Sequence, residues 1–268
     1  MSDHLFDIQK ICQRVWRILD QEQNTFYLIE GSEKAAVIDT GVTVGTRIKP
    51  MLEFLTQKPL ILILTHAHID HFYHMDEFET VYMCHDELTM PDWFLHEMMA
   101  GKDLQLYSTL HIDTGSAIEL GGRILEICKI PGHTPGSVAV FDRTDNLVFT
   151  GDAIGSGCGV WMQLPGSTNL RQYQQSLSVF LRWLLDRTES PAFWGGHCQQ
   201  RWQSAKVPGD NPVTVGLLAD LIDLVSGLLN GSVNSWDIDL PSALRAGERV
   251  CNAAFGRAEI TFNPDNMT

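Results

Sequence analysis

Histidine and aspartate side chains crowd one short stretch of the chain, residues 65–71, which reads THAHIDH. The stretch follows an apolar run at 60–64 that predicts a β-strand. Imidazole and carboxylate groups are ligands that suit zinc, and also iron or manganese where oxygen donors accompany the nitrogens. Three histidines and one aspartate at the end of a strand therefore predict a metal site, and the alternative is a solvated polar loop or a histidine cluster of the purification type.

The spacing inside this stretch predicts more than one ion. If the chain stays extended, His66 and His68 point to the same side, because side chains alternate with period two, and they could hold a single ion. Asp70 and His71 are adjacent, so in an extended chain they diverge and are free to serve a second ion. Four potential ligands from one loop indicate two metals.

Three later positions offer further ligands, and each follows an apolar run and lies beside glycine. They are His133, Asp152 and His197. Glycine permits backbone conformations with positive φ and a close approach of the chain to an ion, and loops at strand ends commonly carry function. Taken singly, each of the three has a structural alternative, a hydrogen-bonded histidine or an aspartate that caps a turn. Together with the first cluster they indicate one site.

These residues, in this order and together with Asp39 in the segment VIDTG at 37–41, resemble the metallo-β-lactamase superfamily in its binuclear hydrolase branch. The resemblance covers about residues 15–200. It implies an α/β fold, an αββα sandwich of two mixed sheets flanked by helices. It also implies two divalent metal ions per chain, with zinc as the first choice and iron or manganese as alternatives.

The resemblance further implies a role for each residue of the site. It assigns one metal to His66, His68 and His133, the other to Asp70, His71 and His197, and the bridging position to Asp152. It places Asp39 near the site without making it a ligand. All seven ligand positions are filled, which argues against relatives that lost a metal or replaced ligands.

The elements that must position these residues can be predicted from the hydrophobic pattern. Short apolar or alternating runs predict strands near 15–18, 25–29 and 35–38, and the uniformly apolar run at 60–64 predicts a central strand covered on both faces. Apolar residues at helical spacing predict helices near 48–55, 173–185 and 215–229. Mixed strands and helices fit a layered α/β architecture.

The whole chain favours one domain over residues 1–268, because no linker, repeat or low-complexity tract divides its 268 residues. Residues 212–265 are expected to complete the sandwich, and 88–110 is a candidate lid, with a helix docked on the sandwich as the alternative. A formal net charge of −14 disfavours extended nucleic-acid binding. Six unpaired cysteines, the lack of an N-terminal secretory signal and the lack of a membrane-spanning run predict a soluble cytoplasmic protein. Assembly into a homo-oligomer stays open.

The predicted chemistry is hydrolysis. Two divalent ions about 3.5 to 4 Å apart hold a bridging water as hydroxide at neutral pH, and Asp70 is expected to orient that hydroxide as well as to bind metal. We expect Trp161, Met162 and Trp93 to contact an apolar substrate, with packing in the core as the alternative for these residues. The resulting hypothesis is a metal-dependent hydrolase of a small, partly apolar acyl compound, an ester, thioester or lactone. The alternatives are a phosphodiester hydrolase and a metal-binding sensor or partner-binding protein with little catalysis.

Overall fold

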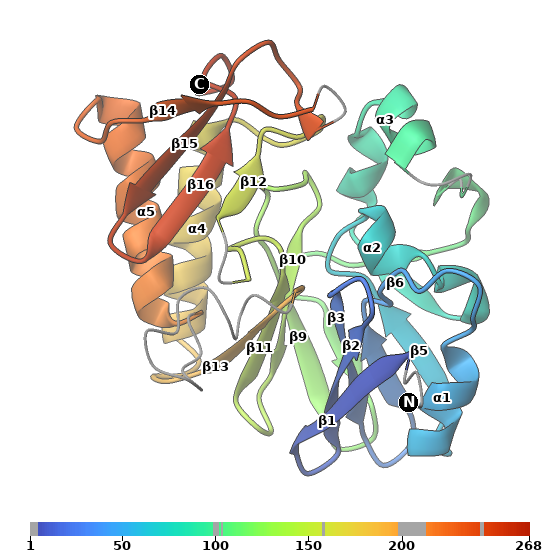
Figure 1. Cartoon of the computed structure of the whole chain (residues 1–268). Helices are drawn as coiled ribbons and strands as arrows, with labels where there is room; N and C mark the ends of the chain where they lie inside the picture. The colour runs from blue at the N-terminus through green and yellow to red at the C-terminus, as the bar shows by residue number, and fades with distance from the viewer. Residues whose placement is uncertain (1–4, 99–101, 103, 157–158, 198–212, 242–243) are drawn as a thin grey trace.

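The strands of this protein form three sheets in a computed structural model that describes residues 5–98, 102, 104–156, 159–197, 213–241 and 244–268 (Figure 1). The first sheet has seven strands, in the order β1 (Phe6–Cys12), β2 (Val15–Asp20), β3 (Thr25–Glu30), β4 (Ala35–Ile38), β5 (Leu60–Ile63), β6 (Val81–Met83) and β7 (Leu110–His111). The second has five, in the order β13 (Ala192–Gly195), β11 (Leu147–Gly151), β10 (Val138–Asp142), β9 (Ile124–Lys129) and β8 (Ala117–Glu119). The third has four, in the order β12 (Val160–Met162), β16 (Ala258–Phe262), β15 (Val250–Phe255) and β14 (Trp236–Ile238).

The strand that precedes the histidine-rich stretch lies inside the first sheet. β5 runs parallel to both of its neighbours, β4 and β6, and its residues Leu62 and Ile63 are fully buried. Strands covered on both faces have uniformly apolar sequences, because neither face meets water. The prediction of a central, doubly covered strand at 60–64 is therefore confirmed.

The third sheet is an addition to the two sheets that the sequence predicted. It joins β12, from the middle of the chain, to a C-terminal group of strands through the parallel pairing of β12 with β16. β12 and β14 have three residues each, which is too short for a periodic pattern to be recognised in the sequence. The third sheet could therefore not be predicted from the hydrophobic pattern.

The structure has the helices α1 (Lys49–Leu55), α2 (Ile69–Phe72), α3 (Asp92–Met98), α4 (Leu170–Leu185) and α5 (Val215–Asn230), with 3₁₀ turns η1 (Met75–Glu77), η2 (His85–Thr89) and η3 (Leu104–Leu106). Three helices, α1, α4 and α5, match the predicted ranges closely, whereas α2 falls where the chain was expected to be extended and α3 lies in the candidate lid. α4 begins at a capping box in which Asn169 and Gln172 satisfy each other's backbone N–H groups. α5 ends at Gly231, whose φ of 77° is the left-handed conformation that closes a helix without strain in glycine.

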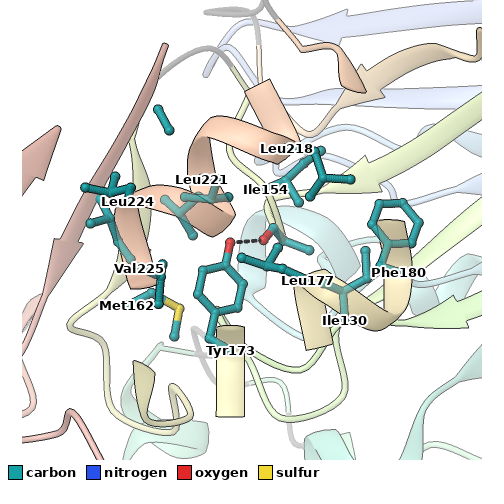
Figure 2. Close-up of a cluster of buried hydrophobic side chains, with 14 of the residues drawn as sticks. Ile130, Ile154, Met162, Tyr173, Leu177, Phe180, Leu218, Leu221, Leu224 and Val225 are labelled. Carbon is teal, nitrogen blue, oxygen red and sulfur yellow. Dashed lines mark hydrogen bonds between the residues drawn. The ribbon is translucent and has the colours of Figure 1, made fainter. Parts of the chain in front are cut away.

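Three apolar layers hold the elements together and define the order of the sandwich. One lies between the first two sheets and includes Ile63 and Phe149. A second joins the outer face of the first sheet to α1 and α3, with Leu52 and Phe94 as members. The third joins the second and third sheets to α4 and α5, around Tyr173 and its neighbours (Figure 2). Helices thus cover the outer faces of two sheets packed on each other, and the predicted αββα sandwich is confirmed.

None of the described helices combines the length and the apolar character that crossing a lipid bilayer requires. The four cysteines that the structure describes form no disulfide; they are Cys12, Cys84, Cys128 and Cys251. Cys158 and Cys198 lie outside the described residues.

Candidate metal centre

The histidine-rich stretch changes conformation in its middle. His68 is still extended, whereas α2 begins at Ile69, because the carbonyl of His68 accepts hydrogen bonds from the backbone N–H groups of His71 (2.9 Å) and Phe72 (3.3 Å). The assumption that the chain stays extended through Asp70 and His71 is therefore wrong. The helical turn does not separate their side chains but brings both toward His197.

The strand pairing of the second sheet brings the last two ligand candidates together. β11 and β13 run parallel, with Gly151 opposite Gly195, so that Asp152 and His197 leave the sheet at the same edge. His197 Nε2 lies 2.9 Å from Asp152 Oδ2. The end of β13 is also tied to the first sheet, because the backbone N–H of Thr25 donates to the carbonyl of Gly196 at 2.7 Å. The edge of the sandwich therefore gathers residues from both sheets.

The seven candidate ligands form two groups joined by one carboxylate. In each group the potential ligand atoms lie within 4.8 Å of one another. We call them the histidine group (His66, His68 and His133) and the mixed group (Asp70, His71 and His197). Oδ2 of Asp152 lies 3.9 Å from Nε2 of His133, 3.8 Å from Nε2 of His71 and 2.9 Å from Nε2 of His197. A single oxygen atom thus reaches both groups.

Asp39 holds two of the histidine rings from behind. Its φ of 60° is unusual for a residue other than glycine, and such backbone strain concentrates at functional sites. Its Oδ2 accepts hydrogen bonds from His71 Nδ1 (2.9 Å) and from the hydroxyl of Thr65 (2.7 Å). Because that hydroxyl proton is used, the Thr65 oxygen accepts from Nδ1 of His66 at 3.1 Å. Nε2 of His66 and Nε2 of His71 are left to face the centre.

The ring of His133 is oriented by the backbone. Its Nδ1 donates to the carbonyl of Trp161 at 2.7 Å, so Nε2 carries the lone pair in the neutral ring. That Nε2 lies 2.9 Å from Nδ1 of His68. At this distance Nδ1–H of His68 donates to the lone pair of His133. With Nδ1 deprotonated, both nitrogens would fit one cation, because they belong to a group whose ligand atoms lie within 4.8 Å of one another.

Three buried polar atoms at this centre have no hydrogen-bond partner among the described residues. They are Nε2 of His66, Nε2 of His71 and Oδ1 of Asp152, whose residues form a group with ligand atoms within 4.8 Å of one another. Buried polar atoms in proteins are nearly always paired, so a group of unpartnered ones needs a ligand. Nitrogen and carboxylate donors at this spacing fit divalent metal binding.

The two groups differ in charge. Burial lowers the pKa of each histidine in the histidine group, which keeps the three rings in the neutral form that binds metal. Burial also opposes the charged form of His71, but the carboxylates of Asp70, Asp39 and Asp152 outweigh it and raise the pKa of His71 to about 10.

The carboxylate that joins the two groups is ionised. Burial raises the pKa of Asp152, but the neighbouring His197 and His71 outweigh burial and hold this pKa well below its usual range. The pKa of His197 is raised in turn, because Asp152 outweighs burial. The carboxylates of the centre therefore stabilise positive charge at the place where a cation would lie.

A cavity of about 430 Å³ opens onto the two groups. Trp161 lines the cavity with 42% of its surface exposed, whereas the next residue, Met162, points to the other face of β12 and is buried in the core. Trp93 is exposed on α3 and is not among the described residues that line the cavity. The structure therefore brings one of the three predicted substrate contacts, Trp161, to the metal centre.

The candidate lid at 88–110 contains the end of η2, followed by α3, η3 and the start of β7, and its residues 99–101 and 103 lie outside the described part of the chain. Phe94 on α3 is fully buried, and its ring lies edge-on to that of His68, with 5.8 Å between the ring centres. α3 thus packs directly behind a candidate ligand. The lid itself stays a prediction.

Two residues that support the ligand loops were not predicted from the sequence. Glu87 is fully buried and accepts hydrogen bonds from both loops of the histidine group. Tyr173 donates its hydroxyl proton to the carbonyl of Ala153, beside Asp152, at 2.6 Å (Figure 2). Glu87 lies in a polar segment and Tyr173 in an apolar helical stripe, so nothing in the sequence distinguished either residue from its neighbours.

Comparisons with known proteins agree with this geometry. Residues 19–193 match the family model described as the metallo-beta-lactamase superfamily. Among proteins of similar sequence, the acyl-coenzyme A thioesterase MBLAC2 of Homo sapiens is 28% identical over 167 residues, which cover 49% of this chain and 58% of that protein. The hydroxyacylglutathione hydrolase GloC of Haemophilus influenzae is 28% identical over 150 residues, covering 51% of this chain and 68% of that protein. The match to the human relative thus spans little more than half of its length.

Solved structures show the same fold. A metallo-beta-lactamase from Pontibacter korlensis superposes with a TM-score of 0.58 and 17% sequence identity, covering 82% of this chain and 99% of that one. A metallo-beta-lactamase family protein from Thermus thermophilus superposes with a TM-score of 0.55 and 16% identity, covering 85% and 97%. At these identities the likeness concerns the fold alone.

Proposed function

The chain belongs to the metallo-β-lactamase superfamily, and from this premise we propose that it is a metal-dependent hydrolase of a small, partly apolar acyl compound, an ester, thioester or lactone. The observation that carries the proposal is the reach of Asp152, whose Oδ2 lies within 3.9 Å of nitrogens from both ligand groups. One carboxylate oxygen between two sets of ligands fits a pair of ions that act on the same substrate.

In this proposal the histidine group would hold one ion, the mixed group would hold a second, and Asp152 would serve as a ligand to both. Zinc is the metal we propose, because imidazole nitrogens predominate among the donors. When bound, such a pair supplies a water nucleophile at neutral pH and a Lewis acid for the scissile carbonyl oxygen.

The side chains of this chain would place and orient the reactants. The carboxylate of Asp70 is 28% exposed, so it can accept a hydrogen bond from the attacking water and fix its direction. Trp161 offers an apolar surface at the cavity to the acyl group. The carbonyl of Trp161 also orients His133, so the same residue lines the cavity and positions a proposed ligand.

Two observations favour the acyl substrate over the alternatives. None of the described residues that line the cavity is a lysine or arginine, whereas Glu22, which is not a candidate ligand, is a carboxylate. Such a lining supplies no side-chain cation for the charged oxygens of a phosphodiester, while Trp161 offers an apolar surface to an acyl group. The open cavity and the partly exposed Asp70 also argue against a sensor, which would need an obstructed pocket.

The test compares three substrates on the zinc-loaded protein: p-nitrophenyl acetate, an acyl thioester of N-acetylcysteamine, and bis-p-nitrophenyl phosphate. We expect turnover of one or both acyl compounds, loss of that turnover after chelation, recovery on addition of zinc, and no turnover in Asp152→Ala. Turnover of the phosphodiester alone would support the phosphodiesterase instead. Failure with all three at full metal occupancy would support the sensor, and unchanged activity in metal-free protein would refute the mechanism.

A further inference from the structure

Glu87 is a buried carboxylate with no part in the chemistry proposed above. It lies in the 3₁₀ turn η2, after β6, and its exposed fraction is zero. Its hydrogen-bond partners among the described residues are neutral donors, two backbone N–H groups and one hydroxyl. Glutamate is almost never fully buried without a charged partner, because removing an ionised carboxylate from water is costly. The cost of burying Glu87 indicates that its carboxylate has a specific role.

The hydrogen bonds of Glu87 connect the two loops that carry the histidine group. Oε2 accepts from the backbone N–H of Ala67, the residue between His66 and His68, at 2.8 Å. Oε1 accepts from the backbone N–H of Gly136 at 2.7 Å and from the hydroxyl of Thr134 at 2.6 Å. Thr134 directly follows His133 in the chain. One carboxylate thus spans the backbone of both loops, one oxygen to each.

The second loop is shaped to admit this carboxylate. A Cβ atom at Gly136 would lie 2.7 Å from Oε1, 2.8 Å from Cγ and 2.8 Å from the backbone nitrogen of Glu87, so both the side chain and the backbone of Glu87 approach this loop. Gly136 is not among the glycines with positive φ, so its backbone does not require glycine for conformational reasons. The absence of a side chain at this position therefore gives Glu87 the room to approach the loop.

We propose that Glu87 is a positioning residue that sets the distance between the loop of His66 and His68 and the loop of His133, and thereby the affinity and geometry of the metal ion in the histidine group. The inference rests on the metal site of the proposed function. An apolar side chain could fill the same volume at lower cost, but it would leave the three donors unpaired and the spacing of the two loops unset.

Glu77 offers a matched control within the same chain. It is also buried, with 6% of its surface exposed, and its carboxylate accepts from the backbone N–H groups of Ile48 (3.1 Å) and Lys49 (2.9 Å) at the start of α1. Unlike Glu87 it also pairs with ionisable side chains, those of His74 (3.0 Å) and Arg47 (3.4 Å). None of these partners is a member of the histidine group or directly follows one in the chain. Glu77→Gln therefore makes the same chemical change in a buried carboxylate that receives backbone hydrogen bonds, without touching the histidine group.

The experiment titrates metal-free protein with Co²⁺ and records the visible absorption spectrum, with the free energy of unfolding measured by urea for each variant. For Glu87→Gln we expect the affinity for the first Co²⁺ to fall by roughly 10- to 100-fold, and its absorption bands to shift, as for other groups that support metal ligands. For Glu77→Gln we expect a comparable loss of unfolding free energy with native Co²⁺ affinity and spectrum. Native affinity and spectrum in Glu87→Gln, or an equal change in Glu77→Gln, would overturn the inference.

A second variant keeps the test decisive if Glu87→Gln does not fold. Gly136→Ala retains the carboxylate and pushes it away from the loop, so we expect weaker Co²⁺ binding and a shifted spectrum; native binding would overturn the inference. Failure of the two proposals can be told apart. Native protein that binds Co²⁺ but hydrolyses none of the three substrates refutes the hydrolase while the Glu87 comparison stands, whereas native protein that binds no Co²⁺ refutes both.

Discussion

The histidine group and the mixed group sit side by side, share Asp152, and differ in how they are held. The histidine group consists of neutral rings, all nearly fully buried, and Glu87 contacts its backbone. The mixed group is charged and partly exposed, and Asp39 contacts one of its rings directly. Under the proposal of two ions, we expect the histidine group to select its cation by the spacing of its loops and the mixed group by its negatively charged side chains.

Removing a ligand from each group is the strongest way to test this division. We expect His68→Ala to release the ion of the histidine group and His197→Ala to release that of the mixed group, so that each variant retains about one ion per chain. Elemental analysis after dialysis at controlled free zinc measures this. If either substitution empties the protein of metal, the two groups do not bind independently and the comparison fails.

Asp39→Asn should lower the metal affinity of the mixed group more than that of the histidine group, and the effect should be smaller than that of removing a ligand. The amide no longer accepts as a carboxylate does from Nδ1 of His71, so we expect the mixed group to lose metal affinity by roughly 10- to 100-fold. The histidine group feels Asp39 only through Thr65 and should lose less. Thr65→Val is the matched control, since it breaks the link to His66 and leaves the contact with His71. Competition with a coloured chelator gives both affinities, and an equal loss in both groups would contradict the division.

Two tyrosines allow the same comparison at the level of stability. Tyr173 donates to the carbonyl of Ala153 beside Asp152, and Tyr27 donates to the carbonyl of Gly195 at 2.5 Å, near His197. Changing either to phenylalanine leaves a buried carbonyl with one hydrogen bond fewer, which costs about 1 to 2 kcal/mol of unfolding free energy. Urea denaturation measures the loss. Tyr27→Phe should lower the metal affinity of the mixed group more than that of the histidine group, whereas Tyr173→Phe should not. Identical metal affinities in the two variants would contradict this prediction.

The pH dependence of stability tests the charge state of the carboxylate that contacts the histidine group. Burial raises the pKa of Glu87 from 4.5 to about 7, although hydrogen bonds from Thr134, Ala67 and Gly136 oppose the rise. Between these pH values the unfolded chain has released a proton that the folded chain still holds, so the contribution of Glu87 to stability falls as the pH rises from about 4.5 to about 7. Below and above this range Glu87 carries the same charge in the folded and the unfolded chain.

Metal-free native protein and Glu87→Gln, unfolded with urea at a series of pH values, isolate this contribution. We expect the native protein to lose stability relative to the variant across that interval and the difference to be constant above it. A difference that does not vary with pH would show that Glu87 is ionised throughout, and that its loop contacts outweigh burial.

Local patterns predicted the fold and the candidate ligands well where the signal is contained in a short segment. The covered strand β5 and the helices α4 and α5 followed from apolar spacing, and the ligand candidates followed from residue types at strand ends. The convergence of Asp70 with His197 could not be predicted in this way, because it depends on α2 starting at Ile69. Glu87 could not either, because its partners lie 20 to 49 residues away and exist only once the loops have met.

The hydroxyl of Tyr27 and the carbonyl of Gly195, 168 positions apart, meet at the edge of the sandwich. Contacts between such distant segments form slowly, because the loss of chain entropy precedes the contact energy that rewards it. A refolding chain can therefore build much of its first sheet before His197 arrives. Uptake of an ion by the mixed group should accordingly come late in folding, after the bulk of the secondary structure, which makes the metal a reporter of the final docking step.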